Sequence, residues 1–470
     1  MEFSINDFDR IFKVPLKEHV IAKDTGLYDS LNHYKFEHEA TAPALENLSL
    51  VHKDPDEYFI QQQIRNAFGR DIKFNNSSIA SHPDFKELIV GGTKSQYITT
   101  MFVDIKGSTR LSLIYPDLEF IYKFKNAVIK ACIEVIRSFD GHVHRIMGDA
   151  VLGFFGSKDL SRQQSILDCI NSAAMLTVIL ENMIKPWLQR EKPDFDIKDF
   201  GFRVGCNFGD NDQVLWGNYG YGKVGEISPT GLPVDLAAKL QSLAQKNQIM
   251  LGQDLLEYFN WPEFFTSIKQ TQENFKEVPE PFITPNLSYK DGKLLNYKMR
   301  LLKTNEYVLG LPIGRRTKID VIKNITSSNN IIEHPNFEII AYVLRPNEKE
   351  YLEYKSNSLV IEKNSKIRVD VIAHNLNLGE SHRVFFYKTN HTGYKNEPEL
   401  EKALDPEDEK YEIEIDEEKS TVWGFGWRFG SKPASFGRSC SYKGLHTIKC
   451  EVRDNKNIVI FRDYIYVPIA

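Results

Sequence analysis

The chain has 470 residues, of which 41% are hydrophobic and 26% are charged, and its formal net charge is −5. This composition is that of an ordinary globular protein with room for two or three domains. The excess of negative charge argues against a general nucleic-acid-binding surface, so we expect no nucleic-acid partner.

The cysteines and the apolar segments indicate where the protein works. No two of the five cysteines have CxxC spacing and several lie in apolar segments, which is typical of reduced thiols; they are Cys132, Cys169, Cys206, Cys440 and Cys450. No signal-peptide pattern is found near the N-terminus, and the most apolar helical segment, 173–180, is too short to cross a bilayer. We therefore expect a cytoplasmic protein with no membrane span.

Residues 1–92 are expected to form a partly helical N-terminal extension. Phe8, Ile11 and Phe12 make a short amphipathic stretch, and apolar residues at helical spacing predict a better helix within 58–68. This part of the chain shows no pattern typical of catalysis. We expect it to pack on the following domain or on a dimer, with partner binding as the alternative.

Residues 97–156 read as strand, helix and hairpin. The β-branched and aromatic run 97–103 predicts a buried strand that ends on Asp104. A glycine-containing turn and a helix at 117–139 follow, and then two strands, 142–147 and 150–155, that are closed by Gly148 and Asp149. Two carboxylates, Asp104 and Asp149, are thus predicted at strand ends that one sheet can bring together.

An aspartate at a strand end is often only a helix cap or a turn residue. Here, however, Asp104 precedes a turn of Gly107, Ser108 and Thr109 that leads into a helix. Such a turn offers backbone N–H groups to an anion. Two carboxylates beside a phosphate-binding turn suit a pair of Mg²⁺ or Mn²⁺ ions, which take oxygen ligands and bridge triphosphate oxygens.

The segments FVDIKGSTRL and RIMGDAVLGFFG resemble the catalytic domain of class III nucleotidyl cyclases, and the resemblance extends over 97–255. It implies an α+β, ferredoxin-like domain with an antiparallel-rich sheet, which we place with its connector at 93–325. It also implies two Mn²⁺ or Mg²⁺ ions per active site, bound by Asp104, Asp149 and the carbonyl of Ile105. In this family the sites lie at the interface of a dimer, so we expect a homodimer.

After the hairpin, the sequence predicts a long helix at 161–185 that ends near Pro186, and then strands at 202–208, 213–216 and 222–224. The segment that follows, 225–244, is expected to carry further site residues. By resemblance, Ser228 occupies the base-selecting position, and Asp235 and Lys239 replace an Asn and an Arg of the family. A lysine supplies charge without the bidentate fork of arginine. The alternatives are an exposed i, i+4 salt bridge between Asp235 and Lys239, and a degenerate, nucleotide-binding sensor.

The residues that would contact the base match neither purine pattern of the family, because Arg145 and Ser228 stand at those positions. Phe102 shares a strand face with Asp104. By resemblance its position lines the base pocket of the partner subunit, which the bulky ring would narrow. Arg145 can only donate, which favours the carbonyl oxygens of uracil, so UTP is the first expected substrate. The alternative substrates are CTP and, for an adenylate cyclase with an atypical pocket, ATP. The alternative structural interpretations are a surface position for Arg145 and a core position for Phe102.

The last third of the chain predicts a separate all-β, sandwich-like domain at 335–470. A polar, proline-interrupted connector at 260–336 precedes strands at 337–343, 366–373, 384–387, 447–452 and 458–467, and the acidic run 403–419 is expected to be a solvated loop or edge. Its end resembles the C-terminal sensor domain of adenylyl/guanylyl cyclases and SMODS proteins. The combination is similar to the pyrimidine cyclases of Pycsar antiphage defence, which implies an unknown phage-derived activator.

Overall fold

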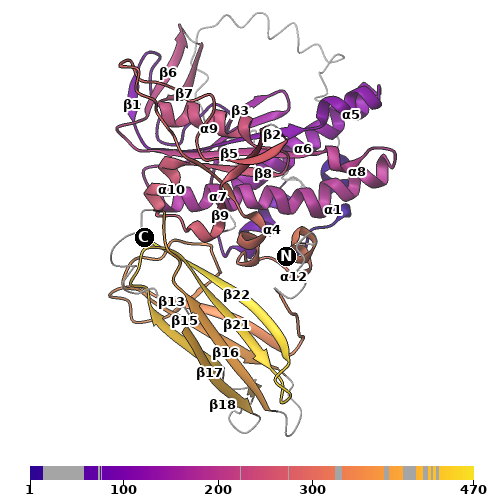
Figure 1. The fold of residues 1–470 in the computed structure, drawn as a ribbon, viewed down its shortest axis with the longest axis vertical. Helices are drawn as coiled ribbons and strands as arrows, with labels where there is room; N and C mark the ends of the chain where they lie inside the picture. The colour runs from indigo at the N-terminus through magenta and orange to yellow at the C-terminus, as the bar shows by residue number, and fades with distance from the viewer. Residues whose placement is uncertain are drawn as a thin grey trace, which may run out of the picture.

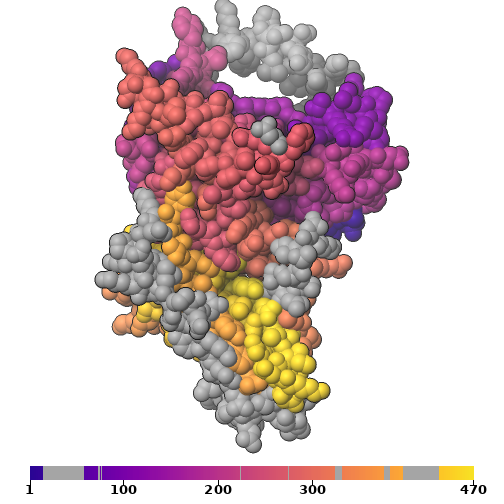
Figure 2. Space-filling view, viewed as in Figure 1, coloured from indigo at the N-terminus to yellow at the C-terminus, as the bar shows by residue number. Residues whose placement is uncertain are grey.

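The computed structural model describes residues 1–13, 58–71, 75, 77–222, 224–273, 275–322, 331–374, 381–394, 409–416, 422–424, 427–429 and 433–470, with the backbone alone for 381 and 409–429. The chain forms an upper part of helices and sheet and a lower part of strands only (Figure 1). The same division is visible on the surface, where the yellow and orange C-terminal residues lie below the purple to coral ones (Figure 2).

A seven-stranded sheet forms the centre of the upper part. Its strands in spatial order are β3 (His142–Met147), β4 (Ala150–Phe155), β2 (Ile98–Lys106), β5 (Gly201–Gly209), β8 (Gln248–Gly252), β12 (Met299–Leu302) and β9 (Thr266–Ser267). The pairs are antiparallel except β5 with β8, which is parallel. The predicted α+β class with an antiparallel-rich sheet is confirmed.

Helices cover both faces of this sheet. Helix α6 (Leu118–Ser138) and helix α7 (Arg162–Ile179) share the largest apolar core with β2 and β5, and α9 (Leu232–Leu243) packs on β5 and β8 from the other side. The apolar positions Phe124, Val128, Ala131 and Val135 put one buried stripe on α6. Asp117 caps this helix, because its carboxylate accepts a hydrogen bond from the Phe120 N–H at 3.0 Å.

Shorter helices surround this core. N-terminal helices α1 (Ile5–Lys13) and α4 (Phe59–Ala67) pack on α6, and the expected helix within 58–68 is therefore confirmed. The remaining short helices are α5 (Ser108–Ile114), α10 (Gln253–Phe259), α11 (Thr304–Leu309), α12 (Arg315–Ile322) and the 3₁₀ turns η2 (Ile197–Asp199) and η3 (Glu263–Phe265).

Helix α7 does not end near Pro186 as expected. It continues through a π-helical turn, η1 (Leu180–Ile184), into α8 (Lys185–Glu191), which has Pro186 in its first turn. A π-helical turn is wider than an α-helical turn and changes the backbone hydrogen-bond pairing next to Pro186, which has no N–H to donate. The resulting 30-residue helix, Arg162–Glu191, is long and apolar enough to cross a membrane, so the expectation that its apolar segment is too short is wrong. However, 89% of the most apolar window of this helix is buried inside the protein.

A second, three-stranded sheet of β1 (Thr93–Ser95), β6 (Leu215–Tyr221) and β7 (Val224–Thr230) stands beside the edge of the first. Strand β6 continues past the predicted 213–216, whereas the predicted strand 222–224 is wrong, because it overlaps β7 at Val224 only. Buried Trp216 packs edge-on against Phe154 with ring centroids 5.0 Å apart, which joins the two sheets. A small hairpin, β10 (Lys269–Glu273) with β11 (Lys276–Glu280), lies on the rim.

The lower part is a sandwich of two four-stranded sheets. One sheet has the order β14 (Leu352–Tyr354), β13 (Phe337–Leu344), β15 (Lys366–Ala373), β20 (Ala434–Ser439), and the other β17 (Glu409–Asp416), β16 (Ser381–Thr389), β21 (Gly444–Arg453), β22 (Val459–Ile469), with a hairpin of β18 (Val422–Gly424) and β19 (Trp427–Phe429). Val369, Phe386 and Val452 lie in the core between them. The described part of the acidic run is β17, a strand at the edge of its sheet. In the predicted connector, the polar segment 326–330, which the sequence predicts to be a loop, lies outside the described residues.

Buried amide groups join the two parts. The Asn171 side chain on α7 donates to the Asn357 carbonyl at 2.9 Å and accepts from Asn357 Nδ2 at 3.0 Å. Gln164, seven residues earlier, accepts from the Val360 N–H at 2.8 Å. Asn171 and Asn357 are fully buried, so one loop of the sandwich is fixed on the central helix of the upper part.

Candidate active site

Strand β2 places Phe102 and Asp104 on the face of the sheet that looks away from α6 and α7. Side chains alternate along a strand, and Met101, Val103 and Ile105 lie in the core on the α6 and α7 side. Phe102 and Asp104 therefore point to the opposite face, where both are half-buried. The alternative of Phe102 as a plain core residue is wrong.

One row of side chains crosses four strands of this face. Arg145 on β3 is opposite Leu152 on β4, Leu152 is opposite Phe102, and Phe102 is opposite Gly205 on β5. Directly opposed residues of antiparallel strands point to the same side of a sheet. Arg145 and Phe102 therefore share a face, with Leu152 between them.

The next row, two residues further along the strands, contains the first metal-binding candidate. Ala150 on β4 is opposite Asp104, and Asp104 is opposite Arg203 on β5. Arg203 donates from Nε to Asp104 Oδ2 at 2.8 Å. The sequence analysis missed Arg203, although it lies in the predicted strand 202–208, because a strand prediction does not include the register that sets Arg203 opposite Asp104.

Asp149 lies next to the end of β2. It follows Gly148, whose φ of +67° makes the tight turn between β3 and β4, and its carbonyl accepts the Ile105 N–H at 3.1 Å. The Ser108 hydroxyl donates to Asp149 Oδ2. The backbone bond next to Asp104 brings the two strand ends together, as the sequence predicted for the two carboxylates.

The turn after β2 depends on glycine. Gly107 has φ +93°, and a Cβ there would lie 2.2 Å from the Asp199 carbonyl oxygen. Helix α5 begins at Ser108, which is buried, whereas Thr109 is exposed. Gly107 thus forms the predicted turn into the helix, and Ser108 and Thr109 are the first residues of α5, with Ser108 beside Asp149.

Arg145 has a carboxylate partner that the sequence analysis did not consider. The Arg145 Nη2 atom donates to Glu226 Oε1 on β7, and His144 Nε2 lies 2.9 Å from the Ile227 carbonyl. Ser228, two residues after Glu226, is on the same side of β7 and half-buried. The structure therefore groups Arg145, Glu226 and Ser228 where β7 meets β3.

Helix α9 brings Asp235 and Lys239 to the same face of the sheet. It packs directly on Gly205, where a Cβ would lie 2.5 Å from the Ala237 carbonyl oxygen. Asp235 is exposed and Lys239 half-buried, and within the described residues no ion pair joins them. The alternative of an i, i+4 salt bridge is therefore not what the structure has.

The ligand atoms available here suit Mg²⁺ or Mn²⁺. Asp104 and Asp149 each have one carboxylate oxygen for which no hydrogen-bond partner is found among the described residues. The third candidate ligand is the backbone carbonyl of Ile105, the residue that follows Asp104. Nowhere in the described parts of the chain do three or more His, Cys, Asp or Glu residues form a group that could hold a metal ion. An all-oxygen set of two carboxylates and a carbonyl fits ions that complete their shell with substrate phosphate.

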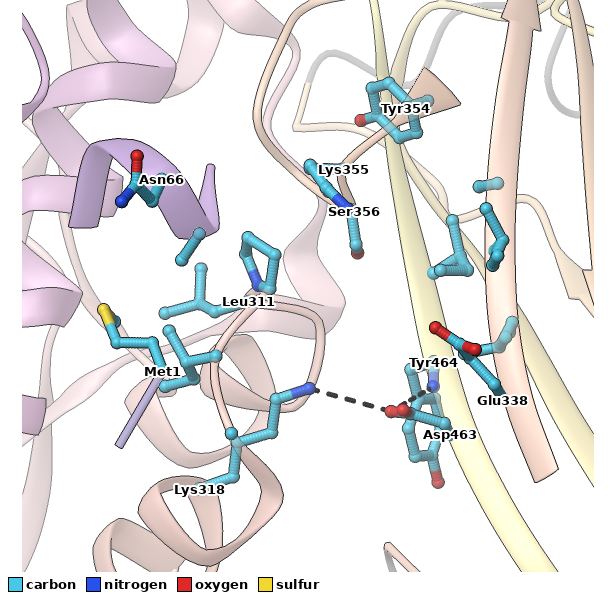
Figure 3. Close-up of a pocket in the computed structure, with 18 of the residues that line it drawn as sticks. Met1, Asn66, Leu311, Lys318, Glu338, Tyr354, Lys355, Ser356, Asp463 and Tyr464 are labelled. Atoms are coloured by element: carbon cyan, nitrogen blue, oxygen red, sulfur yellow. Dashed lines mark hydrogen bonds and ion pairs between the residues drawn. The ribbon is translucent and has the colours of Figure 1, made fainter. Parts of the chain in front are cut away.

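A large cavity of about 730 Å³ lies elsewhere, between the two parts of the chain. Figure 3 shows Lys318 of α12 extending from one wall toward Asp463 of β22 on the other, with Nζ and Oδ1 3.7 Å apart. Burial lowers the pKa of the Lys318 ammonium group. None of the residues of the two rows lines this cavity, so it is separate from the carboxylates.

Comparison with known proteins gives matches over nearly the whole chain. Residues 320–470 match the model of the adenylyl/guanylyl and SMODS C-terminal sensor domain. A cytidylate cyclase of Escherichia coli is 36% identical over 422 residues, 88% of each chain, and one of Staphylococcus aureus is 29% identical over 403 residues, 86% of this chain and 85% of its own.

Solved structures also match, over less than half of this chain. The adenylyl cyclase CyaB of P. aeruginosa is 18% identical with a TM-score of 0.35, over 45% of this chain and 95% of its own. The guanylyl cyclase Cya2 is 21% identical with a TM-score of 0.33, over 41% of this chain and 91% of its own. The identity and mutual coverage with the first of the curated relatives establish that this chain belongs to the family of the Escherichia coli cytidylate cyclase.

Proposed function

We propose that this chain is a cytoplasmic, metal-dependent nucleotide cyclase that converts a pyrimidine nucleoside triphosphate to its 3′,5′-cyclic monophosphate and diphosphate. The observation that carries the proposal is the hydrogen bond from the Ile105 N–H to the Asp149 carbonyl at 3.1 Å. It joins the strand ends that hold Asp104 and Asp149, on the face that also presents Arg145 and Phe102.

Each residue of this face has a part in the proposed reaction. Asp104, Asp149 and the Ile105 carbonyl would hold Mg²⁺ or Mn²⁺, which would supply charge neutralisation of the triphosphate and Lewis acidity toward the ribose 3′-hydroxyl. In the reaction the 3′-hydroxyl loses its proton to water, its oxygen bonds to the α-phosphorus, the bond from the α-phosphorus to the bridging oxygen of the β-phosphate breaks, and diphosphate leaves. Arg203 orients Asp104, and Lys239 stabilises developing phosphate charge.

The turn of Gly107, Ser108 and Thr109 would bind the phosphate chain. Its backbone N–H groups lie beside Asp149, since the Ser108 hydroxyl already donates to that carboxylate. Asp235, exposed on α9, would accept a hydrogen bond from the ribose. An ionised carboxylate cannot donate, so Asp235 could not make the hydrogen bond to a ribose oxygen that an asparagine amide can make.

Two pyrimidine substrates have separate support. Arg145 by itself favours UTP, because its donors match the two carbonyl oxygens of uracil. The names of both relatives support CTP. In either case Phe102 disfavours the larger purines, which argues against an adenylate cyclase.

We further propose a homodimer with shared sites and a signalling role. Large apolar side chains are exposed near the site, among them Ile146, Met147, Tyr221 and Val224, which suits burial against a second copy. The match of 320–470 to a sensor-domain model supports control by an infection-derived activator in antiphage defence.

Incubation of the purified chain with each of the four nucleoside triphosphates and Mn²⁺ tests the proposal, with products identified by mass spectrometry. We expect one cyclic pyrimidine nucleotide and diphosphate. Nucleotide binding without any product would instead support the rival function, a degenerate nucleotide sensor, which the replacement of the family's Asn and Arg by Asp235 and Lys239 favours.

A further inference from the structure

We infer that Glu226 is a second base-reading residue and that, together with Arg145, it selects cytosine over uracil. The inference rests on the proposed function, because it assigns a role within the same site. Its basis is the pairing of the two side chains across the contact of β3 and β7.

A side-chain contact from β3 to the backbone of β7 fixes the position of Glu226. His144 Nε2 lies 2.9 Å from the Ile227 carbonyl, which aligns β3 with β7 one residue away from Arg145 and Glu226. His144 is buried, and its burial lowers the pKa of the imidazole, so it remains neutral and does not neutralise Glu226 from 3.6 Å away. Arg145 is therefore the cationic side chain that pairs with the Glu226 carboxylate.

Polar atoms of the pair stay available for a ligand. Arg145 Nη2 donates to Glu226 Oε1, whereas Arg145 Nη1 and Nε and Glu226 Oε2 have no partner within the described residues. The side chains of Arg145 and Glu226 are 49% and 32% exposed. The pair thus presents the acceptor Oε2 and, because Nη2 has a second N–H, a two-donor edge of the guanidinium to a ligand.

This order of groups is complementary to cytosine. The Watson–Crick edge of cytosine has a donor, the 4-amino group, followed by two acceptors, N3 and O2. The Glu226 carboxylate would accept from the amino group, as acidic side chains do when they read cytosine, and the Arg145 guanidinium would donate to N3 and O2.

Uracil fits the same groups poorly. Its edge is acceptor, donor, acceptor, so in either orientation only one of three positions matches and the other two place like groups together. Each buried polar group left unpaired costs about 1–3 kcal/mol. Arg145 alone therefore favours uracil, but Arg145 with Glu226 favours cytosine.

The competing explanation is an ordinary surface ion pair, because both side chains are partly exposed and such pairs contribute about 0–1 kcal/mol. The two explanations differ in what they predict for the 4-amino group. If Glu226 only orients Arg145, its loss affects all pyrimidine substrates equally. If Glu226 accepts from the base, its loss affects only substrates that carry the amino group.

The test compares CTP, UTP and 2-pyrimidinone riboside triphosphate, which keeps N3 and O2 but lacks the 4-amino group, in the wild type and in Glu226→Ala. We expect the wild type to prefer CTP over both by roughly 10- to 100-fold in kcat/KM, and Glu226→Ala to reduce both preferences to nearly one. Glu226→Gln should restore the preference in part. The matched control is Glu119→Ala, which removes an exposed glutamate paired with Lys123 on α6 and should leave all ratios unchanged.

A wild-type preference for UTP, or a Glu226→Ala variant that slows all three substrates by the same factor, would overturn the inference while leaving the cyclase function intact. If no triphosphate is cyclised, the proposed function fails instead. The inference is then decided by calorimetric binding of CTP and UTP to the same variants, in which an unchanged affinity ratio overturns it and a ratio that falls in Glu226→Ala supports it.

Discussion

Asp104 has a cationic partner from its own sheet. Arg203 donates to one of its carboxylate oxygens, and the two side chains are 18% and 25% exposed. The rigid fork of the guanidinium holds the rotamer of the carboxylate. The other carboxylate oxygen has no hydrogen-bond partner among the described residues and can therefore bind a cation.

Replacing either carboxylate should remove cyclisation and leave the fold intact. We expect Asp104→Asn and Asp149→Asn to lower turnover by at least roughly 10²-fold, because a neutral amide is a poor ligand for the ions that neutralise the triphosphate. Product formation and the thermal unfolding midpoint are the two measurements. Asp291→Asn, in an exposed turn, is the control; turnover near the wild-type rate in either site variant would contradict the assignment.

A buried histidine should make the protein sensitive to acid. Burial lowers the pKa of His82 to about 3, where its ring stacks on Phe85 with centroids 4.1 Å apart. A base whose pKa is lower in the folded state stabilises the fold above the unfolded pKa of about 6.5, and this stability is lost as the pH falls toward 3. Between pH 7 and 4.5 the loss amounts to roughly 2–3 kcal/mol.

His82→Phe should flatten this dependence, because phenylalanine keeps the stacking and has no proton to gain. The measurement is the free energy of unfolding from urea titrations at several pH values. Parallel curves for the wild type and the variant would mean that other groups cause the acid sensitivity.

Helix α9 can approach the sheet only because β5 has a glycine beneath it. A Cβ on Gly205 would lie 2.5 Å from the Ala237 carbonyl oxygen and 2.3 Å from the Gln241 nitrogen. Gly205→Ala should therefore displace α9, with Lys239 on it, and cost about 1–3 kcal/mol of stability together with a loss of turnover. Gly437→Ala, in strand β20 with its nearest neighbour 3.8 Å away, should change neither. Unfolding and product formation of both variants check this expectation.

Helix α7 connects the sandwich to the catalytic sheet. In the middle of the helix, Asn171 exchanges hydrogen bonds with Asn357. Nearer its start, Ser165 Oγ lies 2.8 Å from Thr99 Oγ1 on β2, the strand that carries Asp104. The helix thus contacts both the loop of the sandwich that contains Asn357 and strand β2, which carries Asp104.

Asn171→Ala should destabilise the chain by about 2–4 kcal/mol, because it leaves Asn357 Nδ2 and the Tyr307 hydroxyl buried without their acceptor. The urea midpoint measures the loss. Asn286→Ala, which removes an amide contact at the surface, should cost less than about 0.5 kcal/mol. Equal losses in the two variants would contradict a buried junction.

At the scale of the whole molecule, shared sites predict complementation between inactive chains. In the proposed two-fold dimer, each site combines the metal carboxylates of one chain with Arg145, Ser228 and Lys239 of the other. One chain lacking Asp104 and one lacking Lys239 then form one site with both defects and one intact site. A mixture of Asp104→Ala and Lys239→Ala chains should therefore regain up to about half of the wild-type activity per heterodimer. Recovered cyclic product after mixing, with heterodimers verified by native mass spectrometry, is the readout; heterodimers without activity would refute shared sites.

Local patterns of the sequence were sufficient for most elements of secondary structure. The helix predicted at 117–139 is α6 (Leu118–Ser138), the hairpin 142–147 with 150–155 is β3 with β4, and the strand 366–373 is β15. These elements follow from residue periodicity and from turn residues, which act over a few neighbours. The ends of β6 and β7 and the continuation of α7 past Pro186 were not predicted, because long-range packing outweighs the local effect of glycine and proline there.

The sequence by itself determined the chemistry of the candidate site: the two aspartates and the glycine turn are recognisable from residue type and spacing, and Arg145 from the resemblance to class III nucleotidyl cyclases. Only the tertiary structure decided which side chains accompany them. Arg203 reaches Asp104 through strand register, and Glu226 reaches Arg145 through the contact of two different sheets. Register and sheet contact are set by burial across the whole core, and no local stretch of sequence contains that information.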